Sequence, residues 1–391
     1  MKLQQGLHLA YCTNIHRGET WTETLDALER YTLAVRDQVS PGKPYAIGLR
    51  LSDQASRELA HPQTLLKFQK WLEQKECYVF TINGFPFGRF HGTRIKEKVY
   101  APDWSSPERL EYTNRLFDLL AVLVPAGVEG SVSTLPGSFK EFIHDPEQVA
   151  AIRQNIRRCA EHIERVAEAC GRELHLGLEP EPLGLFENTA ETVRFFSELR
   201  GERFPQDLWR RVGVNYDTCH FAVEFEDPRL ALEQFRRHAI RISKFHLSSA
   251  LKVIPTPEAL AELSHFAEDT YLHQVMVRGS EGFLMRYRDL GDALREQTSQ
   301  RNSGEEWRIH FHIPLQSRGT PLFQTTADHL LGVLDIIAEQ PDLCSHLEME
   351  TYTWEVMPPE IKNRSVVDQL VAEYGWTLEE LRVRQLAAGI P

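Results

Sequence analysis

The sequence lacks the segments that carry proteins into or across membranes. No run of about 18 apolar residues occurs among its 391 residues, although a transmembrane helix needs one of about that length. The first residues contain neither a long apolar stretch nor a small-residue cleavage site, so they do not look like a secretory signal. We therefore expect no membrane insertion.

Paired cysteines are also missing. The six cysteines are scattered along the chain, and none forms a CxxC pair. Scattered thiols in a chain of this length do not make the disulfide framework of a small secreted domain. The cysteine pattern therefore predicts a protein of the reducing cytoplasm.

Positive charge is in deficit. The 44 Lys and Arg residues against 56 Asp and Glu residues give a formal net charge of −12. Proteins that bind nucleic acid need basic surface to neutralise phosphates, so we expect no nucleic-acid partner. Hydrophobic residues make up 42% of the chain and charged residues 26%, which is typical of a globular protein.

The sequence does contain a regular alternation of short apolar runs and longer helical patterns. Nine runs are typical of strands: 8–12, 45–51, 77–82, 129–134, 174–179, 212–217, 242–247, 308–313 and 346–351. Helical spacing and capping residues predict helices over 21–37, 105–124, 145–169, 189–199, 227–239, 256–266 and 325–339.

Strands that alternate with helices predict an α/β fold with a parallel sheet and right-handed crossovers. Seven or more such units predict closure into a (β/α)8 TIM barrel. An open doubly wound sheet is the alternative, but no glycine-rich phosphate-binding turn follows the first strand.

Nine strands are one too many for a barrel, and residues 252–307 explain the surplus. Within them, 271–277 and 283–287 flank a turn at Gly279–Gly282, which is typical of a β-hairpin. We expect this hairpin to be inserted after strand seven, and 308–313 to form an extra strand at the barrel rim.

The chain changes character after about residue 355. Pro358 and Pro359 interrupt it, and 364–388 predicts two short helices. We therefore divide the chain into a barrel of residues 1–355, which includes the insertion, and a helical extension of residues 356–391 that packs on the barrel.

Polar side chains end the last four strands of the predicted barrel. Chemistry in a TIM barrel takes place at the carboxyl ends of the strands, so these side chains should share one mouth. In strand order they are Glu179 and Glu181, then Asp217 and His220, then His246, then Glu348 and Glu350. His310 and His312 lie on one face of the extra strand.

Carboxylates gathered at one mouth would repel one another unless a cation lay between them. Glu179, Asp217, His246 and Glu350 together offer three carboxylates and one imidazole. Such a set suits a divalent ion, Mn²⁺, Mg²⁺, Co²⁺ or Zn²⁺, and leaves coordination positions for substrate oxygens or water. The further candidate ligands are Glu181, His220, His310 and His312.

This order of Glu, Asp-x-x-His, His and Glu resembles the xylose-isomerase-like TIM barrels, which include sugar isomerases, ketose 3-epimerases and endonuclease IV proteins. Residues 178–182 are similar to the Glu-Pro-Lys-Pro segment of xylose isomerases, which implies Glu179 as the metal ligand. Residues 181–187 resemble the Glu-x5-Glu segment of the ketose epimerases, which implies Glu181. We prefer Glu179, because it directly ends the apolar run.

The same resemblance implies that Asp217, His246 and Glu350 are metal ligands and that His220 contacts metal or substrate. His310 and His312 fall where endonuclease IV proteins carry an Asp-x-His pair. More narrowly, four segments resemble the metabolite-traffic protein EboE family, which belongs to a bacterial operon that also carries a UbiA-like prenyltransferase. They are 10–16, 83–91, 310–314 and 350–354.

The sequence also departs from these families. Endonuclease IV proteins hold three metals and use a His-Pro-Gly element, whereas Leu135 precedes Pro136 and Gly137 here. A leucine cannot bind a metal, so we expect one metal or at most two. The lysine of xylose isomerases is absent, because Glu181 occupies its place.

We therefore expect a metal-dependent isomerase or epimerase that acts on a sugar, a cyclitol or a related small hydroxylated molecule. Glu179 and Glu350 would bind the metal and move a proton on opposite faces of the substrate, with Glu181 or Glu348 as a second candidate base. His220 would hold a substrate hydroxyl. The residues expected to contact substrate are His16, Asn83, His91, Glu187 and His312.

Two other functions remain open at this point. One is a metal-dependent hydrolase of the phosphoesterase kind, in which His310 and His312 build a second metal position. The other is a metabolite-binding protein without turnover. The sequence is compatible with an oligomer and does not name the substrate.

Overall fold

The computed structural model describes residues 1–92, 94–201, 204–279, 282–297, 305–357, 362 and 364–388. Its centre is a parallel sheet of eight strands in the order β1-β13-β7-β6-β5-β4-β3-β2, and a parallel bridge between Cys12 and Gly48 closes it into a barrel. The strands are β1 (His8–Tyr11), β2 (Tyr45–Arg50), β3 (Cys77–Asn83), β4 (Gly130–Thr134), β5 (Leu174–Leu178), β6 (Val212–Asp217), β7 (Ile242–Leu247) and β13 (His346–Met349).

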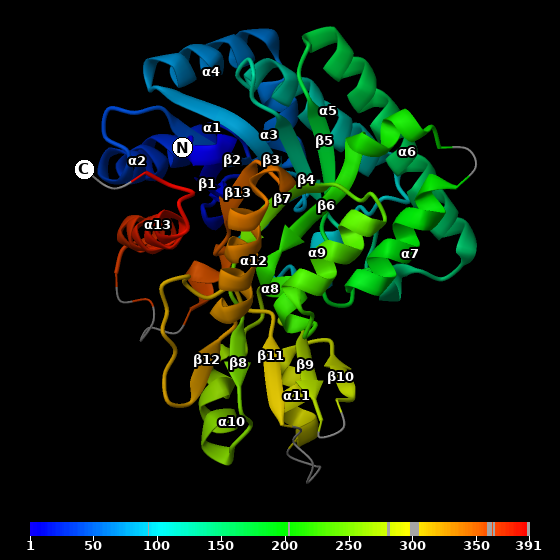
Figure 1. The fold of residues 1–391 in the computed structure, drawn as a ribbon, viewed down its shortest axis with the longest axis vertical. Coiled ribbons are helices and arrows are strands. Elements are labelled where there is room, and N and C mark those ends of the chain that lie inside the picture. The colour runs from blue at the N-terminus through cyan, green and yellow to red at the C-terminus, as the bar shows by residue number, and fades with distance from the viewer. Residues whose placement is uncertain are drawn as a thin grey trace.

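The predicted (β/α)8 TIM barrel is therefore confirmed (Figure 1). The barrel strands are buried on both faces almost throughout, as parallel strands covered by helices are. This explains why they appear in the sequence as continuous apolar runs. The eight barrel strands all fall within one or two residues of their predicted ranges.

Helices surround the barrel (Figure 1). They are α1 (Trp21–Ala27), α2 (Leu33–Val39), α3 (Asp53–Leu59), α4 (Pro62–Gln74), α5 (Pro107–Leu123), α6 (Pro146–Cys170), α7 (Thr189–Arg200), α8 (Thr218–Val223), α9 (Pro228–Arg237) and α12 (Ala327–Glu339). Their ends follow local chemistry: Asp145 caps α6 in a capping box with Gln148, and Gly171 ends it at φ +66°.

The insertion after β7 is larger than the expected hairpin. It forms an antiparallel sheet of five strands in the order β10-β9-β11-β8-β12, which lies below the barrel in Figure 1. The strands are β8 (Leu251–Val253), β9 (Val275–Arg278), β10 (Leu284–Tyr287), β11 (Glu306–Ile309) and β12 (Phe323–Thr325), and the segment also contains α10 (Pro257–Leu263) and α11 (Leu290–Gln297).

The expected hairpin exists within this sheet, because β9 pairs with β10 in antiparallel register. Residues 280 and 281 of its predicted turn lie outside the described residues. The prediction that residues 308–313 form an extra strand at the barrel rim is wrong. Only its first part is a strand, β11, and this strand pairs with β8 and β9 instead of the barrel. Strands of three or four residues carry too little periodicity to reveal such pairing in a sequence.

The C-terminal extension is one helix, α13 (Val366–Val383), and not two short ones. Ser365 caps its start, and its buried residues Leu370, Tyr374 and Leu381 belong to the same hydrophobic cluster as the barrel. This packing holds the helix continuous through the exposed Gly375. Pro358 and Pro359 lie outside the described residues, and the division of the chain at residue 355 stays a prediction.

Two further findings concern the whole chain. Among the described residues, no helix has both the length and the apolar character needed to cross a membrane. All six cysteines are free thiols, in agreement with the absence of a disulfide framework.

Candidate active site

Four side chains converge at the carboxyl ends of the barrel strands. They are Glu179 after β5, Asp217 at the end of β6, His246 on β7 and Glu350 after β13. Each offers one ligand atom, these atoms lie within 4.8 Å of one another, and all four residues are buried. The structure thus brings together the four residues that the sequence indicates as metal ligands, and their binding of a metal stays a prediction.

Asp217 shows most clearly that this set fits a cation. Its Oδ1 accepts hydrogen bonds from the backbone N–H groups of Cys219 (2.7 Å) and His220 (3.1 Å) and from Ser248 Oγ (2.5 Å). Its Oδ2 is buried without a hydrogen-bond partner. A buried carboxylate oxygen is costly when it is left unpaired, and a cation at this point would remove that cost.

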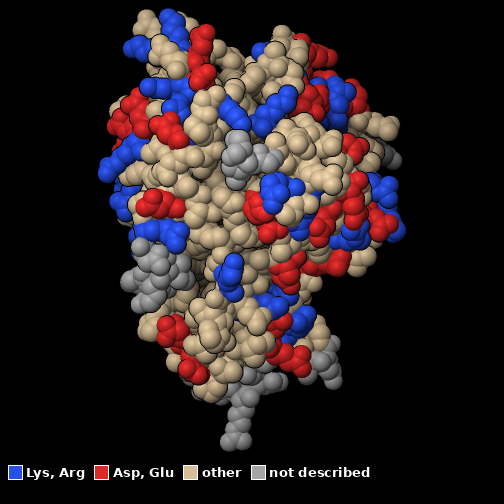
Figure 2. All heavy atoms as spheres, turned by 60° about the vertical axis from the view of Figure 1, so that its left-hand side comes forward, with Lys and Arg blue, Asp and Glu red and all other residues tan. Residues whose placement is uncertain are grey.

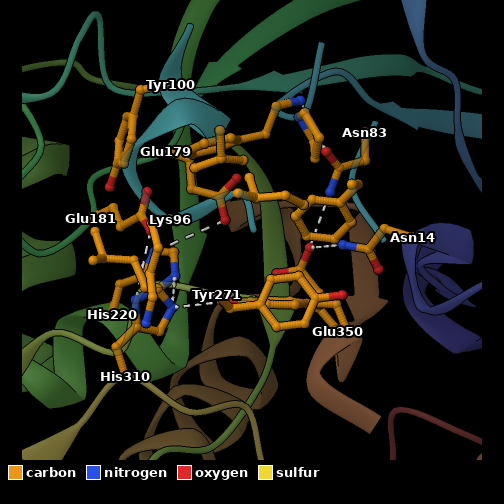
Figure 3. Close-up of a pocket in the computed structure, with 17 residues that line it drawn as sticks. Asn14, Asn83, Lys96, Tyr100, Glu179, Glu181, His220, Tyr271, His310 and Glu350 are labelled. Atoms are coloured by element: carbon orange, nitrogen blue, oxygen red, sulfur yellow. Dashed lines mark hydrogen bonds and ion pairs between the residues drawn. The ribbon is translucent and has the colours of Figure 1, made fainter. Parts of the chain in front are cut away.

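Glu350 is positioned by two amides from other strands. Asn14 Nδ2 donates to Glu350 Oε1 at 2.7 Å and Asn83 Nδ2 donates to the same oxygen at 3.0 Å, as Figure 3 shows. Glu350 Oε2 therefore remains for the centre of the site, where it lies 3.2 Å from His246 Nδ1.

His246 is held from below by a buried ion pair. Its Nε2–H donates to Glu348 Oε2 at 2.9 Å, and Lys244 Nζ donates to the same oxygen at 2.5 Å. This leaves Nδ1 of His246 facing Glu179, Asp217 and Glu350. A carboxylate behind a metal-binding histidine is the usual way in which proteins orient the ring.

Electrostatics at the site depend on this crowding. Burial opposes a charged imidazole at His246, but Glu350 and Glu179 outweigh it and raise the His246 pKa well above its usual range. Burial also works against the Asp217 carboxylate, but His220 and His312 lower the Asp217 pKa well below its usual value. The carboxylates therefore attract positive charge to the centre of the cluster.

Three histidines form a second cluster beside the first. His220 Nδ1–H donates to Pro180 O (2.9 Å), His310 Nδ1–H to Gln274 Oε1 (2.8 Å) and His312 Nδ1–H to Glu350 O (2.9 Å). Each ring therefore keeps its lone pair on Nε2. The Nε2 atom of His310 lies 3.1 Å from that of His220 and 3.1 Å from that of His312.

Glu181 belongs to this second cluster and not to the first. It forms a ligand group with His220 and His310, and its Oε1 is 3.6 Å from His310 Nδ1. Burial raises the Glu181 pKa well above its usual value, and the Glu179 and Asp217 carboxylates add to the shift. Of the two alignments that the sequence permits, this geometry supports the one with Glu179 in the four-ligand set.

A pocket opens above both clusters. Its floor is polar and includes Asn14, Asn83, Glu179, Glu181, His220, His310 and Glu350 (Figure 3). Its walls are mainly aromatic and aliphatic, and they come from the connection after β3, the insertion and the segment after β13: Phe85, Pro86, Phe90, Ile95, Val99, Tyr100, Tyr271, Leu272 and Tyr352.

The other residues expected to contact substrate lie elsewhere. His16 is buried against Tyr11, whose Oη is 2.9 Å from His16 Nε2, and it does not line the described pocket. His91 supports the pocket from behind, because its ring nitrogens bond Asn14 O (2.6 Å) and Tyr271 Oη (2.6 Å). His312 lies in the three-histidine cluster, beneath the lining residues.

Glu187 also lies away from the pocket lining. It forms ion pairs with Lys140 and with Arg286, whose Nε is 3.2 Å from Glu187 Oε1. The carboxylate therefore joins the loop after β5 to the insertion.

Sequence reasoning did not single out Lys244, Gln274, Tyr271 or Tyr352. Lys244 lies inside a predicted strand whose residues were expected to be apolar. Tyr352 was open to detection, since it follows Glu350 by two residues and would share its side of an extended chain. Gln274 and Tyr271 lie in the insertion, and no local signal places them near the barrel mouth.

Comparisons with known proteins give the fold. No family model matches the chain, and no curated protein sequence is significantly similar to it. An L-ribulose 3-epimerase shares the fold with a TM-score of 0.50 and 14% identity, covering 98% of this chain and 96% of its own.

Two further solved structures show the same likeness. A D-tagatose 3-epimerase-like protein has a TM-score of 0.51 at 12% identity, over 96% of this chain and 97% of its own. The D-psicose 3-epimerase from Clostridium cellulolyticum H10, solved with D-tagatose, has a TM-score of 0.51 at 13% identity, and the match covers 96% of this chain and 99% of its own. The chain therefore has the barrel fold of these sugar epimerases. The resemblance to the EboE family stays a prediction.

Proposed function

We propose that this protein is a metal-dependent isomerase or epimerase of a small hydroxylated substrate such as a sugar, a cyclitol or a derivative. The observation that carries the proposal is the convergence of Glu179, Asp217, His246 and Glu350, of which Glu179 and Glu350 line the pocket. The resemblance to the EboE family adds a role in metabolite processing or traffic.

The donor set fits a divalent ion of the Mn²⁺, Mg²⁺, Co²⁺ or Zn²⁺ kind, because it combines three carboxylates with one imidazole. When bound, such an ion would polarise a substrate carbonyl as a Lewis acid. Its holders would be the four residues named above, and Lys244 and Glu348 would keep His246 turned toward it.

Proton transfer is assigned to Glu179 and Glu350. Both line the pocket, and they come from opposite sides of the ligand cluster, β5 and β13, with β6 and β7 between them in the sheet. One carboxylate would remove the proton next to the carbonyl and the other would return one, which is what isomerisation or epimerisation requires. Because Asn14 and Asn83 hold Glu350 Oε1, the position of this carboxylate is set before a substrate arrives.

Substrate hydroxyls would meet the polar floor. Asn14, Asn83 and His220 line it together with the carboxylates. The other lining residues are mainly aromatic and aliphatic. Water that such walls displace from around a bound substrate would strengthen the polar interactions at the floor.

The test measures metal content and proton exchange together. The purified protein should bind a divalent ion at the four-ligand cluster, and Asp217→Asn and Glu350→Gln should each remove one equivalent of bound metal. Incubation with ketoses, aldoses and keto derivatives of cyclitols in D2O should place deuterium at the carbon next to the carbonyl of a substrate.

Glu181→Gln is the matched control, since Glu181 is also a buried glutamate, two residues from Glu179, but lies outside the four-ligand group. It should keep the metal. An unchanged metal content in Glu350→Gln would refute the proposal. Metal binding with no deuterium incorporation from any of these compounds would favour the metabolite-binding alternative.

A metal-dependent hydrolase is a second candidate, and one observation favours it. The three lone pairs of His220, His310 and His312 face one another, with each Nδ1–H already bonded to a carbonyl. Neutral imidazoles arranged in this way suit a transition metal. Asp217 belongs to ligand groups of both clusters, so it would connect two metal positions.

His310→Ala separates these two functions. If the protein is an isomerase that uses the four-ligand cluster, this variant should retain deuterium exchange. If it is a two-metal hydrolase, the variant should lose hydrolysis of phosphoester substrates and one equivalent of metal. Asp217→Asn should abolish either activity.

A further inference from the structure

A third group of metal-ligating side chains lies at the opposite, amino-terminal end of the barrel. It consists of Glu129, which precedes β4, His175 on β5 and His346 on β13. Their ligand atoms lie within 4.8 Å of one another, and Glu129 Oε2 is 3.5 Å from His175 Nε2. This end of a TIM barrel is normally filled by apolar side chains and serves stability.

Both histidines are buried, and neither has its hydrogen-bonding capacity filled. His175 is 1% exposed and His346 is 0% exposed. Nδ1 of His175 and Nε2 of His346 have no hydrogen-bond partner, and Nε2 of His175 has only its 3.5 Å contact with Glu129. Buried polar groups normally find partners, so these nitrogens need an explanation.

The hydrogen bonds around His346 determine where its lone pair points. Ser131 Oγ donates its proton to Thr81 Oγ1 at 2.8 Å. Ser131 therefore accepts in its 2.8 Å contact with His346 Nδ1, so the ring proton is on Nδ1. The unpartnered Nε2 carries the lone pair. A histidine that binds a metal is usually held in this way, by a hydrogen bond from its other nitrogen.

Solvent reaches the Glu129 member of this group through a surface hollow. A hollow lined by His8, Glu129, Arg241, Ser345 and nearby residues lies at the amino-terminal mouth, and the side chain of Glu129 is 42% exposed. The carboxylate therefore stands between solvent and the two buried rings.

Arg241 pairs with Glu129 in this structure, at 2.6 Å from Oε2, and also with Glu173 at 3.1 Å. The Arg241 guanidinium can retain its ion pair with Glu173 when the Glu129 carboxylate turns toward a cation. The Glu129–Arg241 pair therefore does not prevent a metal from binding.

We propose that Glu129, His175 and His346 form a divalent-metal site, suited to Zn²⁺, that stabilises the closed amino-terminal end of the barrel. One carboxylate and two imidazoles are a common protein ligand set for zinc, with water in the fourth position. The site is separate from the pocket at the carboxyl end and does not depend on the function proposed above.

The experiment uses the full chain, stripped of metal with a chelator and titrated with Zn²⁺ by calorimetry, with metal content checked by mass spectrometry. The double variant Asp217→Asn/Glu350→Gln should still bind this zinc, because it changes only the opposite mouth. Adding His346→Ala to it should remove one equivalent. Zinc should also raise the unfolding temperature of the double variant and leave that of the triple variant unchanged.

A second variant, Glu129→Gln, keeps the test valid if His346→Ala fails to fold. It changes a half-exposed side chain, so it should fold like its parent. Glu129→Gln should weaken zinc binding at this site by at least tenfold. Glu173→Gln is the matched control: it removes the other partner of Arg241 but no ligand, so it should bind zinc like its parent. The proposal is overturned if His346→Ala keeps the full zinc stoichiometry, or if Glu129→Gln and Glu173→Gln weaken binding equally.

Discussion

The residues inside the barrel are unusually polar for a TIM-barrel core. Lys244 and Glu348 form an ion pair in which both side chains are at most 1% exposed. Burial opposes the Glu348 carboxylate, but Lys244 and His246 lower its pKa to about 2. Taking one partner from a buried pair leaves an uncompensated charge, which typically costs about 3–5 kcal/mol. The pair therefore holds His246 in place only while both partners are present.

We expect Lys244→Met and Glu348→Gln each to destabilise the fold by about 3–5 kcal/mol. The double variant should lose clearly less free energy of unfolding than the two single variants lose together, because it leaves no unpaired charge. Guanidinium unfolding of the four proteins measures this coupling.

The matched control is the surface pair Arg229 and Glu339, whose side chains are 55% and 53% exposed. A double-mutant cycle on this surface pair should give a coupling free energy of less than about 1 kcal/mol. Equal coupling in the two cycles would contradict the buried-pair argument.

Gly48 makes room for this ion pair. A Cβ on Gly48 would lie 2.0 Å from Glu348 Oε1 and 2.6 Å from Tyr11 O. The Glu348 side chain can shift away from the added Cβ, but the backbone at Tyr11 yields little. Overpacking of this kind typically costs about 1–3 kcal/mol. Gly48→Ala should therefore lower the unfolding temperature and, by displacing Glu348 from His246, weaken metal binding at the four-ligand cluster.

Gly375→Ala is the control for this substitution. Gly375 is exposed inside α13, with nothing within 4 Å of an added Cβ. Alanine there should stabilise the protein by up to about 1 kcal/mol, because it favours the helix. A loss of stability in Gly375→Ala as large as that in Gly48→Ala would contradict the steric explanation.

At the scale of elements, α13 completes the wall of the barrel. Tyr45 Oη on β2 donates to Tyr374 Oη at 2.8 Å, and Thr351 Oγ1 after β13 donates to Glu373 Oε1 at 2.8 Å. Leu315 N–H donates to the same oxygen at 3.2 Å. The helix is therefore tied both to the barrel and to the segment that carries His310 and His312.

Glu373 makes this docking sensitive to pH. Burial raises its pKa from 4.5 to about 7, although the bonds from Thr351 and Leu315 oppose the shift. Below pH 4.5 both the folded and the unfolded chain are protonated here. As the pH rises from 4.5 to 7, the unfolded chain loses this proton while the folded protein keeps it, so stability falls. The contribution is fully lost above pH 7 and amounts to about 3 kcal/mol.

We expect Glu373→Gln to remove this dependence. The variant should be more stable than the parent above pH 7 and should match it near pH 4, with urea unfolding at a series of pH values as the measurement. A parallel pH profile in the two proteins would refute the assignment.

At the scale of the whole molecule, the barrel, the second sheet and α13 share one hydrophobic cluster. The insertion also reaches the connection after β3: Ile95 N and Lys96 N donate to Thr270 O at 2.9 and 3.0 Å. Lys96 Nζ donates to Glu268 O at 2.7 Å and to Asp289 Oδ2 at 2.6 Å. Two segments distant in sequence therefore meet to form one wall of the pocket.

Asp289→Asn should loosen this wall. It leaves the Lys96 ammonium, whose side chain is only 6% exposed, without its carboxylate partner, a loss of about 2 kcal/mol. Hydrogen exchange should become several-fold faster over residues 94–100 and 268–272, while β4 stays protected. Asp292→Asn, which breaks an exposed pair with Arg295, is the control and should change neither segment.

The surface of the molecule carries its charge as a mixture. On the face in Figure 2, Lys and Arg alternate with Asp and Glu and form no continuous basic surface. The expectation that the protein has no nucleic-acid partner, drawn from the net charge of −12, stays a prediction.

The sequence by itself determined the barrel, because its strands are short and apolar and alternate with helices, most of which begin at a capping residue. It also determined that Glu179, Asp217, His246 and Glu350 lie together, since the carboxyl ends of parallel strands must meet at one mouth and these residues stand at those ends. That they bind a metal stays a prediction. Only the tertiary structure decided the rest. The five-stranded sheet, the meeting of Lys96 with Asp289, and the group of Glu129, His175 and His346 join residues whose separation along the chain follows no local period, so only packing brings them together.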